Sequence, residues 1–352
     1  MTAAPGAGAV DDEEALAGAV DAVDAPDVVF GLSRDGRRTV LTGGTGRAPA
    51  VPRERLRYEI GSASKTFTGL LLAHLEASGR LSGAEPAARC FDPRRALGRN
   101  PITLAHLITH TSGLPPLPAD FYPQAVRRWA TNPYAHYPAD RVVRAFLRAR
   151  PRHRPGTRWR YSNFAVASLG HALSVAEATP WDELLSSRVL RPLGLSGTAL
   201  RPAGPGTDAT GHGADGVRRT PPLDIGGFAA AGAVRATVHD LLGYLEAHLR
   251  PEGHPLAGAL REVRRPVLRR GPRHRHVHTL TWFRHATDHG HVYFHSGATS
   301  GQQAFLGFSP DTGTALVAVS TRRFRLRDRL IPVAYGLLTD AGAPGRDSGA
   351  RA

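Results

Sequence analysis

The sequence predicts an α+β fold, in which strands from both chain ends form one antiparallel sheet with flanking helices and a helical region is inserted in the middle. Two β-type runs on either side of Arg34-Asp35-Gly36 predict a hairpin near the N-terminus. Alternation of apolar and polar residues from Val277 onward predicts successive antiparallel strands. The segment between these regions has helical periodicity. This order of elements favours one sheet shared by both ends of the chain.

Each element has a local reason. The hairpin is expected at residues 27–33 and 38–41, and the later strands at residues 277–283, 291–295, 303–308 and 315–320. Helices are expected where apolar residues recur three and four positions apart, at residues 13–23, 62–79, 102–109, 140–150, 162–178, 181–189, 237–249 and 327–339. Gly79 is placed to end the second of these helices. Residues 116–138, rich in proline and aromatic residues, are expected to form a long loop that lines a cleft.

The composition describes a folded globular protein. The 352 residues can bury a large core, and 41% of them are hydrophobic while 21% are charged. We expect a flexible N-terminus with a short helix (residues 1–25), one folded domain (26–340) and a disordered tail (341–352). Within the domain, the sheet part is expected at about 26–64 and 226–340, and the helical part at about 65–225.

The charge balance is strongly basic, with a formal net charge of +15. Such a charge attracts acidic partners at long range. Because arginine provides nearly all of it, we interpret the charge first as a codon bias. The sequence has no nucleic-acid-binding motif and no interleaving of aromatic and basic residues, so no nucleic-acid partner is expected.

Neither a metal nor a cofactor is expected. Cys90 is the only cysteine, which excludes a disulfide and a cysteine-based metal site. His274, His276 and His278 alternate on one strand face without a carboxylate among them, and this pattern predicts a solvated basic strand. The N-terminus begins acidic without an apolar signal core, and no run of about eighteen apolar residues follows. We therefore expect a cytoplasmic protein without a membrane partner; its oligomeric state is left open.

The strongest candidates for chemistry are Ser62 and Lys65, at the start of a predicted helix. Residues at i and i+3 share a helix face, so the Lys65 amine can reach the Ser62 hydroxyl. A neutral amine can take the hydroxyl proton and thereby activate the serine. The unpaired N–H groups and the dipole at the helix start would stabilise negative charge beside Ser62.

Lys65 is the only lysine among the 45 Lys and Arg residues. A guanidinium stays protonated at any usable pH, whereas an amine with a lowered pKa can act as a base. A single lysine beside a candidate nucleophile therefore favours a chemical role over a structural one.

Four stretches resemble, in order and spacing, motifs of the serine β-lactamase-like family, which includes class C β-lactamases, D-alanyl-D-alanine carboxypeptidases, esterases and transacylases. Residues 61–68 resemble its Ser-x-x-Lys nucleophile motif, and residues 107–115 resemble the segment that follows it. Tyr161-Ser162-Asn163 resembles the Tyr-x-Asn motif. His295-Ser296-Gly297 resembles the third motif, which is Lys-Thr-Gly in the lactamases and often His-Ser-Gly in peptidases and esterases. The resemblance covers about residues 26–340.

The resemblance implies a β-lactamase/penicillin-binding-protein-like fold and acyl transfer through Ser62. Tyr161 would share the Ser62 proton with Lys65 and pass it to the leaving group, a role typically worth about 10²–10⁴-fold in rate. Asn163 would hold a substrate amide or carbonyl and the Lys65 amine. The backbone N–H groups of Ser62 and Ala298 would form the oxyanion hole.

The third motif is expected to edge the cleft, with Ser296 and Gly297 binding substrate and Gly297 allowing its close approach. Two interpretations of His295 stay open: a protonated ring would bind a substrate carboxylate, and a neutral ring would only line the wall. His110 and Ser112 are expected to be structural, because their segment has the pattern of a helix end followed by a turn.

These observations predict a serine hydrolase that forms an acyl-enzyme on Ser62 from a small-molecule ester or amide, with or without a carboxylate. The first alternative is a cytoplasmic biosynthetic transacylase of natural-product assembly, which would pass the acyl group to an amine or alcohol. The second is a β-lactamase or D-alanyl-D-alanine carboxypeptidase. His295 in place of lysine, the absence of glutamine after Pro115 and the absence of an export signal disfavour it. A catalytically inactive scaffold is disfavoured because all four motif residues are present.

Overall fold

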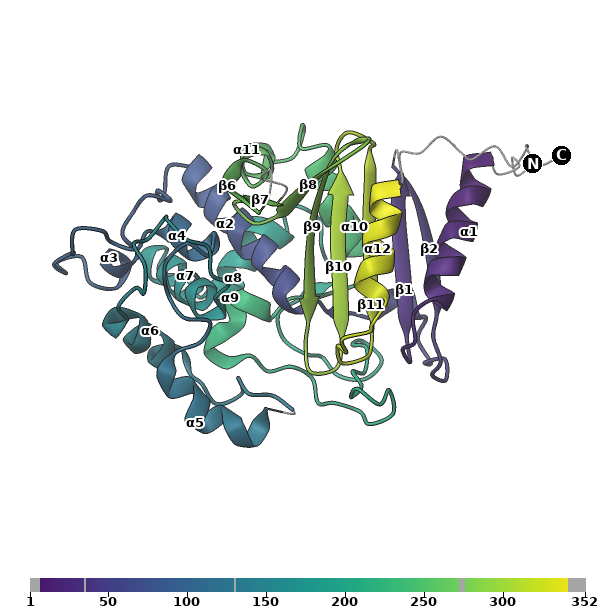
Figure 1. Cartoon of the computed structure of the whole chain (residues 1–352), viewed down its shortest axis with the longest axis horizontal. Helices are drawn as coiled ribbons and strands as arrows, with labels where there is room; N and C mark the ends of the chain where they lie inside the picture. Colours follow the sequence, from purple (N-terminus) through teal and green to yellow (C-terminus); the bar gives the residue numbers. More distant parts are fainter. Residues whose placement is uncertain (1–6, 35, 130, 272–275, 341–352) are drawn as a thin grey trace.

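The computed structural model describes residues 7–34, 36–129, 131–271 and 276–340, and it has the expected α+β architecture. An eight-stranded antiparallel sheet with the strand order β2-β1-β11-β10-β9-β8-β7-β6 forms its centre (Figure 1). The strands are β1 (Val28–Arg34), β2 (Arg37–Gly43), β6 (Pro266–Arg270), β7 (His276–Thr279), β8 (Phe283–Thr287), β9 (Gly290–Ala298), β10 (Gln303–Ser309) and β11 (Thr314–Ser320). A second, small sheet has the order β3-β5-β4, with β3 (Tyr58–Glu59), β4 (Thr198–Ala199) and β5 (Arg235–Ala236).

The two ends of the chain meet inside the large sheet. Strand β1 pairs with β11 so that Val28 lies opposite Ser320 and Arg34 lies opposite Thr314. Strand β11 pairs on its other side with β10, which in turn pairs with β9. Every residue of β10 and β11 is buried, because helices cover both faces of the sheet.

Helices α1 (Ala7–Asp21) and α12 (Leu330–Asp340) cover one face of the sheet (Figure 1). Leu16, Phe30, Leu316 and Leu330 belong to the apolar core between these helices and the strands. The opposite face packs against α10 (Val238–Leu249) and the larger core, which also contains most of α2 (Ser64–Ala77). The start of α2 therefore lies between the sheet and the helical region.

The helical region extends to the left of the sheet in Figure 1. Its helices are α3 (Ala87–Phe91), α4 (Leu104–Ile108), α5 (Tyr122–Ala125), α6 (Ala139–Arg148), α7 (Asn163–Ala176), α8 (Trp181–Leu185) and α9 (Ala229–Gly232). Helix α8 continues as a π-helical turn over Ser186–Leu190, and α11 (Ala257–Glu262) packs against α2. Ser162 caps the start of α7, where its hydroxyl accepts from the Ala165 N–H at 2.9 Å.

Three predictions of local structure were wrong. The expected strand at 277–283 is two strands, β7 and β8, because Thr279 and Trp282 exchange hydrogen bonds across a tight turn that buries Trp282. Segment 116–138 contains α5 and short 3₁₀ turns, since Pro123 is compatible with a first helical turn. Helix α1 begins at Ala7, six residues before the helix expected at residues 13–23. Strand β6 was missed, and the expected tail at 341–352 lies outside the described residues.

One further property follows from the lengths of the helices. Within the ranges given above, no helix combines the length and the apolar character needed to cross a bilayer.

Candidate active site

A sharp turn between β3 and α2 positions Ser62. The 3₁₀ turn Gly61–Ala63 leads directly into α2, and the Ile60 N–H donates to the Val234 carbonyl at 3.1 Å. Gly61 has φ +48°, and a Cβ there would lie 2.5 Å from the Ala298 carbonyl oxygen. A glycine is therefore required for the turn to approach β9 this closely.

Lys65 lies on the first turn of α2, three residues after Ser62. Its Nζ lies 3.1 Å from Ser62 Oγ and donates to the Ala231 carbonyl at 2.8 Å. The side chain is buried, and burial lowers the pKa of Lys65 to about 7, since desolvation penalises the ammonium form. A neutral amine can donate one N–H to Ala231 and offer its lone pair to the Ser62 hydroxyl.

Tyr161 completes this group of side chains. Its hydroxyl lies 2.5 Å from Ser62 Oγ, and Lys65 Nζ lies 5.0 Å from its ring centre. Burial raises the pKa of Tyr161, so the phenol keeps its proton at neutral pH and can donate it. The His110 ring packs against Tyr161 with 4.6 Å between centroids, and its Nδ1 accepts from the Ser162 N–H at 3.2 Å. Burial lowers the pKa of His110 well below its ordinary value, so this ring supports Tyr161 as a neutral group.

Asn163 is the first residue of α7 and lines the cleft beside Ser62. Its Nδ2 donates to the Tyr134 hydroxyl at 3.0 Å, while its buried Oδ1 has no partner among the described residues. Asn163 was expected to contact the Lys65 amine, but among the described residues the two share no hydrogen bond. The amine donates to the Ala231 carbonyl instead. The unpaired Oδ1 can accept a hydrogen bond from a substrate N–H.

His295, Ser296 and Gly297 lie on β9 beside Ser62 and Tyr161. The His295 ring is buried and its Nδ1 donates to the Ser296 carbonyl at 2.7 Å. Burial, with the nearby Lys65 and His278, lowers the pKa of His295 to about 3. The ring is therefore uncharged at neutral pH.

Gly297 lies against the turn that carries the nucleophile. A Cβ at Gly297 would lie 1.9 Å from the Ile60 carbonyl oxygen and 2.8 Å from the Ser62 nitrogen. This contact holds β9 beside the Ser62 backbone and leaves Ala298 at the junction of two cavities.

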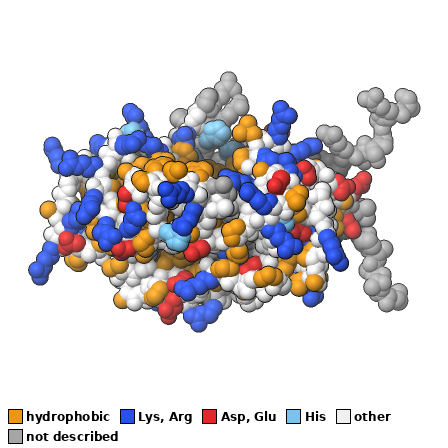
Figure 2. Space-filling view, turned by 90° about the horizontal axis from the view of Figure 1, so that it is seen from below, with side chains coloured by type: hydrophobic (Ala, Val, Ile, Leu, Met, Phe, Trp, Pro, Cys, Tyr) orange, Lys and Arg blue, Asp and Glu red, His pale blue; other side chains and the backbone are white. Residues whose placement is uncertain are grey.

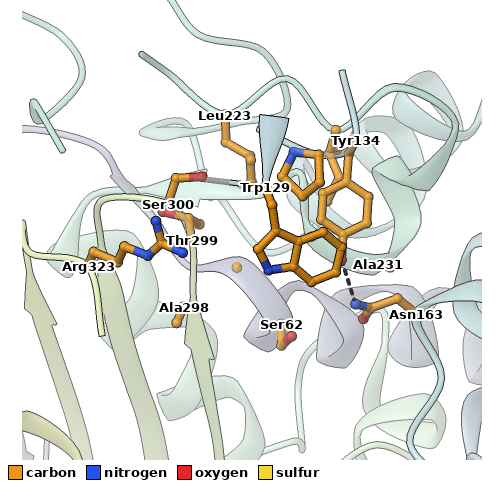
Figure 3. A pocket seen from close by; sticks show the side chains of 14 residues that line it. Ser62, Trp129, Tyr134, Asn163, Leu223, Ala231, Ala298, Thr299, Ser300 and Arg323 are labelled. Carbon is orange, nitrogen blue, oxygen red and sulfur yellow. Dashed lines mark hydrogen bonds between the residues drawn. The ribbon is translucent and has the colours of Figure 1, made fainter. Parts of the chain in front are cut away.

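The two cavities meet at Ser62 and Ala298. The first has a volume of about 230 Å³, and Figure 3 shows Trp129, Leu223 and Tyr134 on one wall with Arg323, Thr299 and Ser300 opposite. The second, of about 370 Å³, lies between β9 and the segment that carries Phe324 and Ile331. Ser62 can therefore be reached from two sides.

Sequence reasoning expected segment 116–138 to line the cleft but did not identify its side chains. Trp129 and Tyr134 come from this segment, whereas Leu223 and Arg323 come from turns far along the chain. The Leu223 N–H donates to the buried carboxylate of Glu59 at 2.6 Å, which ties its turn to β3. In the sequence, only the aromatic content of segment 116–138 indicated that Trp129 and Tyr134 line the cleft, and no pattern indicated Leu223 or Arg323.

The alternating histidines differ from the expected solvated strand. His276 is exposed and its Nδ1 lies 2.9 Å from Nε2 of His285. His278 is buried, and its ring lies 5.0 Å from that of Trp159. His274 lies outside the described residues. Among the residues that are described, no group of three or more His, Cys, Asp or Glu side chains could hold a metal ion.

The geometry predicts how the rate of Ser62 modification depends on pH. Only the neutral Lys65 amine can accept the Ser62 proton, so the rate should rise with pH and reach half its maximum near pH 7. The buried histidines cannot produce this limb, because the pKa values of His295 and His278 are lowered to about 3 and about 4. The measurement is the rate of modification by a fluorophosphonate between pH 5 and 9. A rate that is independent of pH, or that falls as pH rises, would contradict Lys65 as the base.

Comparison with known sequences places the chain in a family. A profile of the beta-lactamase family matches residues 13–339. The chain is 27% identical over 199 residues to a beta-lactamase of Pseudomonas fluorescens, which covers 56% of this chain and 52% of that protein. It is 29% identical over 148 residues to the D-alanyl-D-alanine-carboxypeptidase/endopeptidase AmpH of Escherichia coli, covering 41% and 37%. The chain thus spans about half the length of the curated relatives that it matches.

Solved structures confirm the predicted fold. A beta-lactamase/D-alanine carboxypeptidase from Pseudomonas syringae superimposes with a TM-score of 0.79 at 21% identity, covering 96% of this chain and all of that one. A D-stereospecific amidohydrolase from Streptomyces superimposes with a TM-score of 0.75 at 22% identity, covering 94% and 100%. The profile match over nearly the whole chain agrees with the four motifs, and the chain belongs to the beta-lactamase family, whose members are serine hydrolases.

Proposed function

We propose that the protein is a serine acyl-transfer hydrolase that forms an acyl-enzyme on Ser62 from a small-molecule ester or amide. The observation that carries this proposal is the convergence of three side chains. Ser62 Oγ lies 3.1 Å from Lys65 Nζ and 2.5 Å from the Tyr161 hydroxyl. A nucleophile with a neutral base and a protonated phenol has the groups that acyl transfer requires.

In the proposed reaction, Ser62 Oγ bonds to the substrate carbonyl carbon while its proton moves to Lys65 Nζ. The carbonyl π electrons move to the oxygen and form an oxyanion. When the intermediate collapses, the bond to the leaving group breaks, Tyr161 gives its proton to that group, and Lys65 returns a proton to Tyr161. Water then attacks the acyl-enzyme by the reverse proton route and releases the acid.

The backbone N–H groups of Ser62 and Ala298 are the proposed oxyanion donors. Both residues line both cavities, and Gly61 and Gly297 bring their backbones together. The Ser62 N–H belongs to the first turn of a helical segment, where N–H groups have no intrahelical partner, and Ala298 is the last residue of β9. An N–H group aimed at the developing oxyanion stabilises its charge, and one such donor is typically worth about 3 kcal/mol.

The wall of the first cavity supports a substrate with an apolar group on one side. Trp129 and Leu223 offer apolar surface, and Asn163 offers an unpaired acceptor to an amide N–H. The uncharged His295 supports its role as a wall residue. Arg323 is the cation of this cavity, so we assign it, and not His295, to any carboxylate that the substrate carries.

Labelling of Ser62 tests the proposal directly. We expect a fluorophosphonate or an activated ester to add one group to the intact protein, measured by mass spectrometry, and peptide mapping should place it on Ser62. Ser62→Ala should abolish the adduct. Ser78→Ala at the other end of α2 is the matched control and should keep it, since the Ser78 hydroxyl lies at the helix end, where it donates to the Leu75 carbonyl. An adduct that persists in Ser62→Ala would identify another nucleophile.

A transacylase is the second candidate, supported by the presence of two cavities that meet at Ser62. One cavity would hold the acyl group while an amine or alcohol acceptor enters through the other. An ester panel measured with and without added amines distinguishes the candidates: amide formation in place of acid release supports transfer. The names of several relatives also make a β-lactam or a D-alanyl peptide a substrate to include in this panel.

A further inference from the structure

A third cavity is separate from the two that meet at Ser62. It has a volume of about 560 Å³ and lies between α6 and the loop that begins at Pro115. Pro115 and Phe164 form part of its apolar wall. Its volume is within the range of about 300–1,000 Å³ that is typical of small-molecule sites.

Arginines dominate the lining of this cavity. They are Arg141, Arg144, Arg148, Arg150 and Arg152, which are five of its twelve lining residues. Arginine makes up 44 of 352 residues in the chain (45 Lys and Arg less one Lys), or one in eight. Figure 2 shows Lys and Arg side chains scattered across the face seen from below, so positive charge alone is not unusual on this protein. The fraction of arginine among the lining residues of this cavity is therefore more than three times its fraction in the whole chain.

Most of this charge has no local partner. Arg141 pairs with Asp120 at 3.0 Å and lies over the Tyr137 ring, and Arg144 pairs with Asp140 at 2.7 Å. The other three arginines have no carboxylate within ion-pair distance in the part of the chain that the structure describes. Five guanidiniums and two carboxylates leave a net charge of 5 − 2 = +3. The end of α6 contributes only about −0.5 elementary charge, which these arginines outweigh.

The arginines extend from backbone that is held in place by hydrogen bonds. Arg141, Arg144 and Arg148 lie on one face of α6, at spacings of three and four residues. The Arg152 N–H donates to the Gly113 carbonyl at 2.9 Å, which fixes the following segment to the turn after α4. Two separate elements therefore direct guanidiniums into one cavity. Guanidinium groups bind phosphate oxygens in a bidentate manner, so such a cluster suits a ligand with several phosphate oxygens.

The cavity shares its wall with the catalytic cleft. Phe164 lines the cavity, and the preceding residue, Asn163, lines the cleft. The Ser162 hydroxyl donates to the Pro115 carbonyl at 2.6 Å, and the Phe164 N–H donates to the Pro116 carbonyl at 3.1 Å. The same loop and the same helix start thus separate the two spaces.

We propose that this arginine-lined cavity binds the phosphate group of a small phosphorylated molecule, whose apolar part contacts Pro115 and Phe164. The ligand is either a free phosphorylated effector or the phosphorylated portion of a substrate that reaches around the shared wall. This site is distinct from the Ser62 group, so the proposal does not depend on acyl transfer.

Binding of inorganic pyrophosphate to the full-length protein tests the site by titration calorimetry at fixed ionic strength. The test variant is Arg148→Gln/Arg152→Gln. The matched control is Arg191→Gln/Arg269→Gln, which removes the same charge from exposed arginines outside the cavity. We expect wild type and control to bind equally within twofold, and the test variant to bind about tenfold more weakly or worse. Thermal unfolding and Ser62 labelling should be unchanged in both variants, which shows that they are folded.

If pyrophosphate binds the control variant as weakly as it binds the test variant, the proposal is overturned, because its affinity would then depend only on the net charge of the protein. Absence of binding to wild type at millimolar pyrophosphate would overturn it as well. Kinetics distinguishes the two sources of the phosphate. If the ligand is part of the substrate, pyrophosphate should raise KM for a phosphorylated ester and leave KM for a neutral ester unchanged. If it is a free effector, both esters should respond alike.

Discussion

Replacing Lys65 with arginine is expected to lower the rate of Ser62 acylation by about 10³-fold or more, within the range of general-base catalysis and above. Arginine is a cation and a hydrogen-bond donor, as a protonated lysine is, but a guanidinium does not lose its proton at assay pH. Lys65 is buried and its pKa is lowered to about 7, so the wild-type amine is neutral over much of the assay range. The substitution therefore removes the base while it retains a cation.

Lys65→Met provides the matched comparison, because it removes both the charge and the base. If Lys65 acts as the base, both variants should be equally slow in fluorophosphonate labelling. If Lys65 acts only as a cation, the arginine variant should stay within tenfold of wild type while the methionine variant loses activity. Circular dichroism and thermal unfolding establish that each variant is folded. Addition of small primary amines to Lys65→Ala gives a second measurement, since a base role predicts a partial recovery of rate.

Replacing Gly297 with alanine is expected to lower activity by about 10²–10³-fold and to destabilise the protein by about 1–3 kcal/mol. The new methyl group would lie 1.9 Å from the Ile60 carbonyl oxygen and 2.8 Å from the Ser62 and Ala63 nitrogens. These neighbours are backbone atoms and cannot rotate away. Strand β9 must therefore move from the turn, which would separate the Ala298 and Ser62 N–H groups that we propose as the oxyanion donors.

Gly336→Ala in α12 is the control for this substitution. A Cβ at Gly336 meets no atom within 4 Å, so alanine should leave activity unchanged and raise stability by roughly 0.5–1 kcal/mol through its helix propensity. Initial rates with an activated ester and chemical denaturation give the two quantities. A Gly297→Ala variant with normal activity would show that the close contact between β9 and the turn has no part in catalysis.

The sequence was sufficient for the architecture and for the local part of the site. Strands β9 and β10 were predicted from alternation of residue types, although both faces of the sheet are covered and every residue of β10 is buried. Ser62 and Lys65 were placed together by helical spacing alone. The position of Tyr161 came from the resemblance, and the structure brings its hydroxyl to Ser62 across 99 residues of sequence.

The remaining features depend on contacts that no local pattern encodes. Trp129, Leu223 and Arg323 meet at one cleft only because the fold brings three distant segments together. The turn between β7 and β8 was missed, since its apolar residues are buried and resemble a continuous strand. The uncharged state of His295 depends on burial, which the sequence motif does not specify.

The pairing of β1 with β11 has a consequence for the synthesis of the chain on the ribosome. Val28 cannot pair with Ser320 until nearly 300 further residues have been synthesised. At about 5–20 residues per second, the first hairpin would expose an unpaired edge for roughly 15–60 seconds. Because β11 also joins β1 to β10, a nascent chain that lacks Thr314–Ser320 has two disconnected parts of the sheet, β2-β1 and β10-β9-β8-β7-β6. Folding of the whole sheet, and with it the support of the Ser62 turn, therefore occurs only after the chain has been translated through Ser320.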